Sequence, residues 1–331
     1  MKIGILGLFN YYMYEEVCAE VLEKKGHEVV RLPFGKLVNS VIGKIEFYYS
    51  FRGIISLYYN LRLLRVIKKR NIQIVICWRT TWLYDWVLRK LQKKNVKLIS
   101  YNNDDPFSPH YANGNTHQRN LWKHFKRQIP LFDVNLVFRP VNVEEYNGAG
   151  SKKTELWLPA YIPWRVENIK PTFEKKSIEA IFIGHWEQHR EDYLCYLIEN
   201  GIKVEVYGTK WEKAKSLKSI NVIRPLYGDE YFGYLKSAKI AIAFLSKLNR
   251  DVYTRRNFEI PACGTFMLSE RTDELKYLYK GYNGIDFFSS KEELLDQILR
   301  TDTNKLILTQ FVDKHSILNR IEELIKVIDE I

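Results

Sequence analysis

Residues 251–270, DVYTRRNFEIPACGTFMLSE, contain the pattern that decides the fold. The sequence predicts a helix that begins after Thr254, which is expected to cap it, and that ends at Gly264. The apolar run that follows is typical of a buried parallel strand. A helix start offers free N–H groups, so Arg256 and the arginine before it are expected to form an anion site there, with Glu259 one turn further along. The stretch therefore predicts a helix–strand unit that carries a charged site.

The same alternation of helix and strand patterns extends in both directions from this stretch. Short apolar runs typical of parallel strands, from KIGILGL to GIDFF, are separated by helical patterns. Pro159, Pro163 and Pro171 interrupt the rhythm, which indicates a connector between two domains. We therefore predict an α/β protein with two doubly wound, Rossmann-like domains facing each other across a cleft. The predicted ranges are 1–163 for the first domain, 172–312 for the second, and 313–331 for a last helix crossing back to the first domain.

The composition is that of a globular protein with an anionic partner. The chain has 331 residues, 46% of them hydrophobic, and a net charge of +12, which favours phosphates, an anionic membrane or nucleic acid as partners. The four cysteines are isolated, so neither a disulfide framework nor a zinc site is expected. There is no signal-peptide pattern and no apolar run of the roughly 20 residues that a membrane span needs. The expected location is the cytoplasm, with peripheral attachment to the inner face of the membrane as the alternative.

A second candidate site follows the predicted strand IEAIFIG, in the segment GHWEQHR. Gly184 would let a phosphate approach the backbone, and His185 and Arg190 would supply charge-assisted hydrogen-bond donors. The alternative is a solvated loop with an ordinary surface arginine. Because ligands of open α/β sheets bind beyond the carboxyl ends of the strands, this segment and the start of the helix after Thr254 are expected at the same edge.

Two stretches, TRRNFEIPACGTFMLSERTDEL and GIDFFSSKEELLDQI, resemble the carboxyl-terminal region of GT-B glycosyltransferases. They are most similar to the CgeB-like (spore maturation protein CgeB-like) branch of the group 1 family, in which an Arg precedes a Glu by three residues and ACG follows. Arg256 and residues 262–264 meet that pattern. The resemblance implies a GT-B fold and metal-independent, cofactor-free transfer of a hexose from a nucleotide-diphosphate donor. The implied acceptor is a glycan, a lipid-linked molecule or a protein, in polysaccharide biosynthesis.

The resemblance also implies residue roles. The ribose-binding Glu of the family falls on Glu259, and Gly184, His185 and Arg190 fall at the diphosphate, with His185 replacing the family's Arg. The place of an additional family Glu is near Asp251, so the paired-glutamate motif is incomplete. The remaining predicted donor-binding residues are Tyr253, Thr254 and Arg256.

Asp104 and Asp105 are the candidate catalytic residues of the amino half. They lie in LISYNNDDPF, after a predicted strand, and CgeB-like proteins often show a similar Asp-Asp-Pro. If transfer inverts the anomeric centre, one carboxylate would deprotonate the acceptor hydroxyl; if it retains, the pair would orient hydroxyls. A structural Asp-Pro turn is the alternative. His110, His117 and His124 are rival candidates, but their spacing predicts no metal site.

Residues 45–70, IEFYYSFRGIISLYYNLRLLRVIKKR, mix aromatic and basic side chains. The favoured interpretation is a core helix with a basic solvent side, and the other is a face that rests on an anionic membrane. No signature of a nucleic-acid-binding module is present, so nucleic acid is not an expected partner. For the whole chain, the alternatives to a transferase are a non-catalytic sugar-nucleotide or glycan-binding protein on the same fold and a nucleotide-sugar epimerase.

Overall fold

The computed structural model describes residues 1–49, 52–113, 120, 122–217, 224–302 and 309–331. The chain forms two compact units. Unit 1 comprises Met1–Leu158, Leu248–Arg250 and Ile317–Ile331, and unit 2 comprises Pro159–Lys247 and Asp251–Ser316. Three residues between the ninth and tenth strands therefore belong to unit 1, although their neighbours in sequence belong to unit 2.

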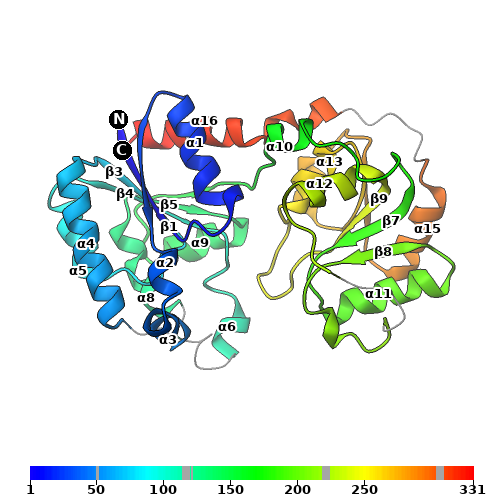
Figure 1. The fold of residues 1–331 in the computed structure, drawn as a ribbon, viewed down its shortest axis with the longest axis horizontal. Helices are drawn as coiled ribbons and strands as arrows, with labels where there is room; N and C mark the ends of the chain where they lie inside the picture. The colour runs from blue at the N-terminus through cyan, green and yellow to red at the C-terminus, as the bar shows by residue number, and fades with distance from the viewer. Residues whose placement is uncertain (50–51, 114–119, 121, 218–223, 303–308) are drawn as a thin grey trace. The chain divides into compact units, whose positions relative to one another are not determined.

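Unit 1 is built on a six-stranded parallel sheet of order β2-β1-β3-β4-β5-β6 (Figure 1). Every residue of β3 and β5 is buried, as expected for parallel strands covered on both faces. From β1 the chain first adds β2 on one side of the sheet and then β3 on the other. The order of the strands therefore reverses between β1 and β3, which is the usual place for a ligand in such folds. The strands are β1 (Lys2–Gly7), β2 (Glu28–Pro33), β3 (Ile74–Trp78), β4 (Lys97–Asn102), β5 (Val134–Val137) and β6 (Thr154–Leu156).

Helices cover both faces of this sheet. Figure 1 shows α1 and α16 on the other side of the sheet from α4 and α5. On the α4 side, Tyr59, Leu63, Leu88 and Phe125 pack into one apolar core with the strands. The helical segments are η1 (Tyr12–Glu16), α1 (Val17–Lys24), α2 (Gly35–Val38), α3 (Val41–Tyr49), α4 (Ile54–Arg70), α5 (Asp85–Gln92), α6 (Pro109–Asn113), α8 (Lys123–Gln128), η2 (Ile129–Leu131), α9 (Pro140–Gly148) and α16 (Ile317–Asp329).

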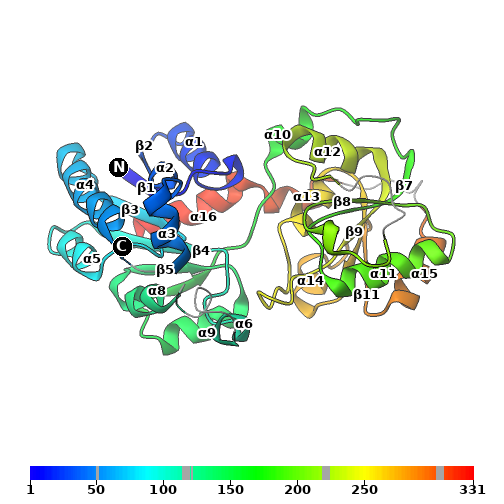
Figure 2. The same ribbon diagram turned by 60° about the horizontal axis from the view of Figure 1, so that its bottom comes forward.

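Unit 2 has a five-stranded parallel sheet of order β11-β10-β9-β7-β8. Its strand β7, between β9 and β8, alternates between two apolar cores: Phe182 packs with side chains of α11 and α15, and Ile181 packs with side chains of α12 and α13. Figure 2 shows α11 and α15 on the other side of this sheet from α12 and α13. The strands are β7 (Ile178–Ile183), β8 (Val204–Tyr207), β9 (Ala238–Ala243), β10 (Phe266–Glu270) and β11 (Ile285–Phe288). The helical segments are α10 (Pro163–Glu167), α11 (Gln188–Glu199), η3 (Trp211–Lys213), α12 (Gly228–Ser237), α13 (Arg256–Ala262), α14 (Asp273–Leu278), α15 (Lys291–Arg300) and η4 (Thr309–His315).

The predicted α/β class with two doubly wound units is thus confirmed. The predicted helix of residues 251–270 is α13, and Gly264 follows it with φ of +71°, a left-handed conformation that glycine adopts without strain. The amide of Gly264 donates to the carbonyl of Pro261 at 3.0 Å. No helix in the described part of the chain has the length and apolar character that a membrane span requires.

Candidate functional site

The candidate donor site lies in unit 2, where β7, β9 and β10 end. Arg190 is its central residue, although its side chain is fully buried on α11. It donates to the carbonyl oxygens of His185 (2.9 Å) and Leu245 (3.2 Å) and forms an ion pair with Glu187 at 2.5 Å. Its Nε is buried without a hydrogen-bond partner in the described part of the chain. The predicted surface arginine is therefore excluded, because this guanidinium is held inside the protein.

A second arginine lies close to the first. Burial and the nearby charge of Arg256 lower the pKa of Arg190 to about 10, so Arg190 stays protonated near neutral pH. Arg256 is the first residue of α13, and its Nε is also buried without a hydrogen-bond partner among the described residues. Two neighbouring cations with unused buried donors form a place where an anion would be stabilised.

Thr254 does not cap α13 through its side chain, which corrects the sequence prediction. Its hydroxyl and its backbone N–H both donate to Oδ1 of Asn257, at 3.1 and 2.7 Å. The amide group of Asn257 is itself fixed, because its Nδ2 donates to Oγ of Ser269 at 2.8 Å. The Thr254 hydroxyl thus acts as a donor to Asn257 and does not accept from the first turn. Tyr253, the residue before it, is buried and packs against the Phe258 ring.

Glu259 is buried one turn into α13, with 5% of its surface exposed. One carboxylate oxygen accepts from Nε of Arg255 at 2.5 Å, and the other accepts from the Tyr231 hydroxyl at 3.0 Å. These two contacts fix the orientation of the carboxylate. Each oxygen keeps a second lone pair, so the group can still accept hydrogen bonds from a diol.

Position 184 has no room for a side chain, so a glycine is needed there. A Cβ at this position would lie 2.6 Å from the Phe182 ring, and the carbonyl of Gly184 accepts from the indole N–H of Trp211 at 2.9 Å. Gly208 approaches the same carbonyl so closely that no other residue would fit there. The two glycines therefore allow the chain segments that follow β7 and β8 to pack closely. His185, the next residue, remains partly exposed.

Sequence reasoning missed three residues of this site: Glu187, His189 and Glu270. Glu187 contacts His185 at 3.1 Å, as well as Arg190, and these partners outweigh the effect of burial and lower the pKa of Glu187. Burial and nearby Lys247 lower the pKa of His189 to about 4, so its imidazole is neutral. Burial raises the pKa of Glu270, which accepts from the backbone N–H of Leu245. Their position at strand ends was the available signal, since GHWEQHR and the last residue of β10 both lie there.

Unit 1 has a polar region of its own after β4. Asp104 is half-buried, and its carboxylate forms an ion pair with Nε of Arg79. Arg79 follows β3, has φ of +51°, and places its guanidinium 5.7 Å from the centre of the Trp122 ring. The charge of Asp104 and, more strongly, burial raise the pKa of nearby Tyr111 to about 12. Asp104 is thus oriented at the carboxyl edge of the sheet by a cation that sequence reasoning missed.

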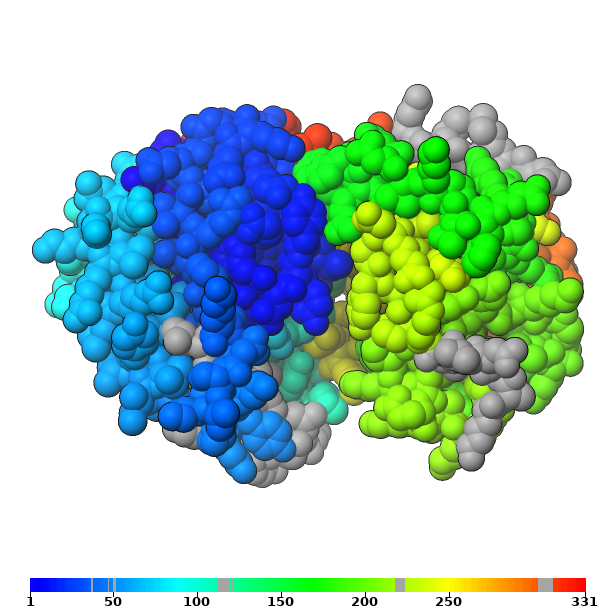
Figure 3. Space-filling model, in the orientation of Figure 1, coloured from blue at the N-terminus to red at the C-terminus, as the bar shows by residue number. Residues whose placement is uncertain are grey.

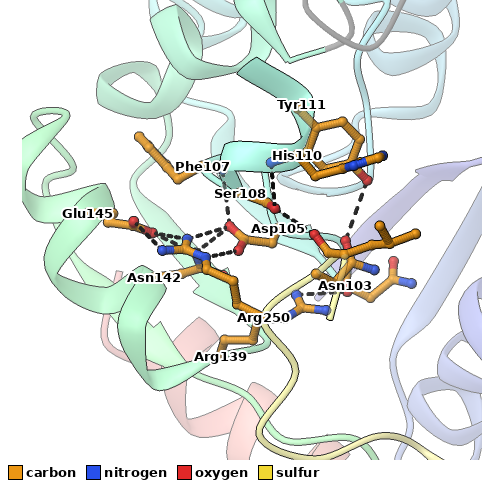
Figure 4. A network of polar contacts seen from close by, with 12 residues as sticks. Asn103, Asp105, Phe107, Ser108, His110, Tyr111, Arg139, Asn142, Glu145 and Arg250 are labelled. Atoms are coloured by element: carbon orange, nitrogen blue, oxygen red, sulfur yellow. Dashed lines mark hydrogen bonds and ion pairs between the residues drawn. The ribbon is translucent and has the colours of Figure 1, made fainter. Parts of the chain in front are cut away.

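Asp105, by contrast, is fully buried, and both of its carboxylate oxygens accept hydrogen bonds (Figure 4). It accepts from Nε and one terminal nitrogen of Arg250 at 2.6 and 3.0 Å, from Asn142 at 2.8 Å and from the N–H of Phe107 at 3.0 Å. Arg250 also donates twice to Glu145, at 3.0 and 2.9 Å. The structure therefore separates the two aspartates: Asp104 borders the edge of the sheet and Asp105 anchors a buried ion-pair network.

Unit 1 contains further ionisable groups besides the two aspartates: Glu15 and the candidate histidines. Glu15 lies on η1, is 4% exposed, and accepts from the N–H of Leu8 at 3.0 Å; burial raises its pKa. His110 lies on α6 beside Tyr111, whereas His124 lies on α8, contacts Arg127 at 2.9 Å, and has a pKa lowered by burial to about 4. His117 lies outside the described residues. Within the described ranges, no three His, Cys, Asp or Glu side chains are grouped so as to hold a metal ion.

Comparison with known proteins supports the architecture. Residues 190–326 match the family model described as glycosyl transferase-like. No curated protein sequence matches the chain. A sucrose-phosphate synthase from Thermosynechococcus elongatus is similar in structure with a TM-score of 0.71 and 10% identity, over 100% of this chain and 98% of that one.

Two other solved structures show the range of proteins that share this fold. HepE from Anabaena, in complex with UDP-glucose, gives a TM-score of 0.63 at 11% identity, over 100% of both chains. A UDP-GlcNAc 2-epimerase from Methanocaldococcus jannaschii gives 0.58 at 10% identity, also over 100% of both. Identities this low establish similarity of fold alone. The protein therefore has the GT-B fold, as predicted, and its residues 190–326 are glycosyltransferase-like.

Proposed function

We propose that the protein is a glycosyltransferase that uses a nucleotide-diphosphate sugar, bound by unit 2, to glycosylate a glycan, lipid-linked or protein acceptor bound by unit 1. The observation that carries the proposal is the pair Arg190 and Arg256, whose buried Nε groups have no hydrogen-bond partner among the described residues. A diphosphate would supply the missing hydrogen-bond acceptors, and its negative charge would offset the repulsion between the two guanidinium groups. The glycosyl transferase-like match of residues 190–326, which include both arginines, supports this assignment.

Each donor-side residue then has a distinct role. Arg190 and Arg256 neutralise the diphosphate as it becomes the leaving group, which needs no metal ion. Glu259, held by Arg255 and Tyr231, accepts hydrogen bonds from the ribose hydroxyls. Gly184, His185, Tyr253 and Thr254 complete the donor site. A hexose as the transferred sugar and membership of the CgeB-like branch remain predictions from the sequence resemblance.

On the acceptor side we propose Asp104 as the functional member of the Asp104–Asp105 pair. Asp105 is fully buried and held by Arg250, whereas Asp104 keeps 19% of its side chain exposed. In an inverting reaction Asp104 would deprotonate the acceptor hydroxyl, and in a retaining one it would orient that hydroxyl. Asp104→Asn should lower kcat by about 10²-fold or more in the first case and by far less in the second. Wild-type kcat in this variant would remove Asp104 from the reaction.

Ligand binding tests the donor site directly. Nucleoside diphosphates and their sugars should raise the melting temperature, because they bind only the folded state. Arg256→Ala should weaken both a nucleoside diphosphate and inorganic pyrophosphate. Glu259→Gln should weaken the nucleotide by about 10-fold or more and leave pyrophosphate binding unchanged, because only the nucleotide carries a ribose. Equal loss of both ligands in Glu259→Gln would contradict the ribose assignment, and no shift with any nucleotide would contradict the function.

An epimerase is the second candidate, and the similarity to the epimerase from Methanocaldococcus jannaschii favours it. A non-catalytic sugar-nucleotide or glycan-binding protein on the GT-B fold remains the third. The bound nucleotide sugar should be incubated without acceptor and the products separated. Slow hydrolysis to free sugar and nucleoside diphosphate is expected of a transferase. An isomerised sugar indicates an epimerase, and an unchanged donor indicates a binding protein.

A further inference from the structure

Helices α3 and α4 expose an unusual amount of apolar surface. On α3 the exposed side chains are Val41, Ile42, Ile45, Tyr48 and Tyr49. At the start of α4 they are Ile54, Leu57, Tyr58 and Leu61. Val41 and Ile54 keep 77% and 78% of their surface exposed, and the informative feature is that these exposed apolar side chains are grouped on two adjoining helices. We call these nine side chains the α3–α4 platform.

The platform is a built part of unit 1. Glu46 on α3 is 4% exposed, and its carboxylate accepts from the N–H groups of Gly53, Ile55 and Ser56 at 3.3, 2.8 and 2.9 Å. It also accepts from the Ser56 hydroxyl at 2.8 Å. These bonds satisfy the free donors at the start of α4 and fix α3 against it. The pKa of Glu46 is lowered because the hydrogen bonds outweigh its burial. The apolar side chains are therefore presented by a fixed pair of helices.

The opposite face of α4 shows why its sequence predicted a core helix. Tyr59, Leu63 and Ile67 are buried in the apolar core of unit 1, which confirms that interpretation for this face. Ile54 and Tyr58 belong to a different stripe, which faces solvent. In the space-filling view, the mid-blue residues of this region form part of the lower surface of unit 1 (Figure 3).

The exposed stripe of α4 changes character along the helix. Its first half is apolar, and its second half carries exposed Arg62, Arg65, Lys68 and Lys69. Residues 41–70 contain a single acidic residue, the buried Glu46, so the exposed charge of this region is entirely positive. No ion pair with another described residue involves these four basic side chains. An apolar surface with tyrosines and a basic border is the pattern of a protein surface that binds anionic lipids.

We propose that the α3–α4 platform docks this protein onto an anionic lipid membrane. The apolar side chains enter the boundary between headgroups and acyl chains, and the basic half of α4 contacts lipid phosphates. Charge favours this occupant over a second copy of the chain, which would bring the same positive surface against it. The apolar half of the stripe disfavours nucleic acid, whose backbone would meet it without compensation. Docking is independent of the proposed donor site in unit 2.

Vesicle co-sedimentation of the full chain tests the proposal. The protein should bind phosphatidylcholine vesicles that contain phosphatidylglycerol and bind pure phosphatidylcholine vesicles far more weakly. Binding should fall at about 1 M salt, where the Debye length is about 3 Å. Arg65→Ala/Lys69→Ala should lower the partition coefficient roughly 25-fold, since each basic residue near such a surface contributes about a fivefold factor. Ile54→Ser/Leu57→Ser should lower it about tenfold or more.

Matched controls come from unit 2. Lys203→Ala/Lys239→Ala removes two exposed basic residues, and Tyr277→Ser removes a side chain that is 81% exposed. Both should bind vesicles like the wild type, and circular dichroism should show that all variants are folded. Absence of binding to the anionic vesicles would overturn the proposal, and so would equal loss in the controls. A dimer in solution that Ile54→Ser/Leu57→Ser dissociates, without vesicle binding, would identify the platform as a self-association surface.

Discussion

Arg190 in unit 2 and Arg250 in unit 1 are both arginines in ion-pair networks near strand ends, but their surroundings are opposite. All three guanidinium nitrogens of Arg250 donate to the carboxylates of Asp105 and Glu145, and the two negative charges raise its pKa. Arg190 contacts one carboxylate and two carbonyls, leaves Nε without a partner in the described chain, and has its pKa lowered by burial and by Arg256.

The difference separates a structural network from a binding site. Around Arg250 the guanidinium is matched by two carboxylates and each of its nitrogens donates to one of them, so the network serves the fold. Around Arg190 a second cation, Arg256, lies nearby and buried donors of both arginines lack partners in the described chain, which costs stability unless an anion binds. Substitutions at the two places should therefore have different consequences: loss of function at one, loss of stability at the other.

The largest effect is expected at Arg256. Arg256→Ala should lower kcat/KM for glycosyl transfer by about 10²- to 10³-fold, because a charge that stabilises the leaving diphosphate is lost. The melting temperature should not fall, since the substitution relieves repulsion with Arg190. Steady-state kinetics with the donor identified by thermal shift, together with thermal unfolding, gives both quantities.

Arg300→Ala is the matched control for Arg256→Ala. Arg300 ends α15, its side chain is 78% exposed, and it pairs only with Asp296 among the ion pairs of the described chain. Because α15 runs back toward the amino ends of the strands, its last residue is remote from the donor site. Arg300→Ala should keep wild-type kinetics. Equal losses in both variants would show that general charge, and not the paired site, supports the reaction.

Arg250→Ala should have the largest effect on stability, about 3 kcal/mol, because it leaves the fully buried Asp105 without its cation. Arg250→Ala/Asp105→Asn should recover much of that loss, since the uncompensated charge is then absent. Urea unfolding of the two variants and of Asp105→Asn alone gives the three differences. A double variant no more stable than Arg250→Ala would contradict the explanation based on the buried charge.

Much of the fold could be predicted because each strand has a local apolar pattern. The run IVICW of β3 and the glycine after α13 encode their own structures, whatever surrounds them. Residues 248–250 show the limit of such reasoning. Arg250 joins unit 1 by ion pairs to Asp105 and Glu145, which are 145 and 105 positions away. A pairing at that separation leaves no local signal in the sequence.

The candidate site shows the same limit in its side chains. The sequence indicated Arg190, Arg256 and Glu259 because strand and helix ends were predictable, although their roles stay predictions. It gave no reason to distinguish Asp104 from Asp105, which are adjacent and chemically identical. Their difference comes from tertiary partners: Arg79 for the first and Arg250 for the second.

The smallest effect is expected at His189, which lies between the charges of the Arg190 site. Its pKa is about 4 in the folded protein and 6.5 for an ordinary histidine, so between these pH values the unfolded chain binds a proton that the folded one does not. Stability should therefore fall as pH drops from 6.5 to 4, with His189 contributing at most about 3 kcal/mol. His189→Gln should flatten this part of the stability curve, measured by urea unfolding at several pH values against the wild type. The lost ring contact with Phe244 should shift the whole curve equally and leave its slope unaffected. An unchanged slope would mean that the imidazole is solvated and keeps an ordinary pKa. His189 would then not be a buried neutral group beside Arg190, and this part of the contrast with the Arg250 network would be wrong.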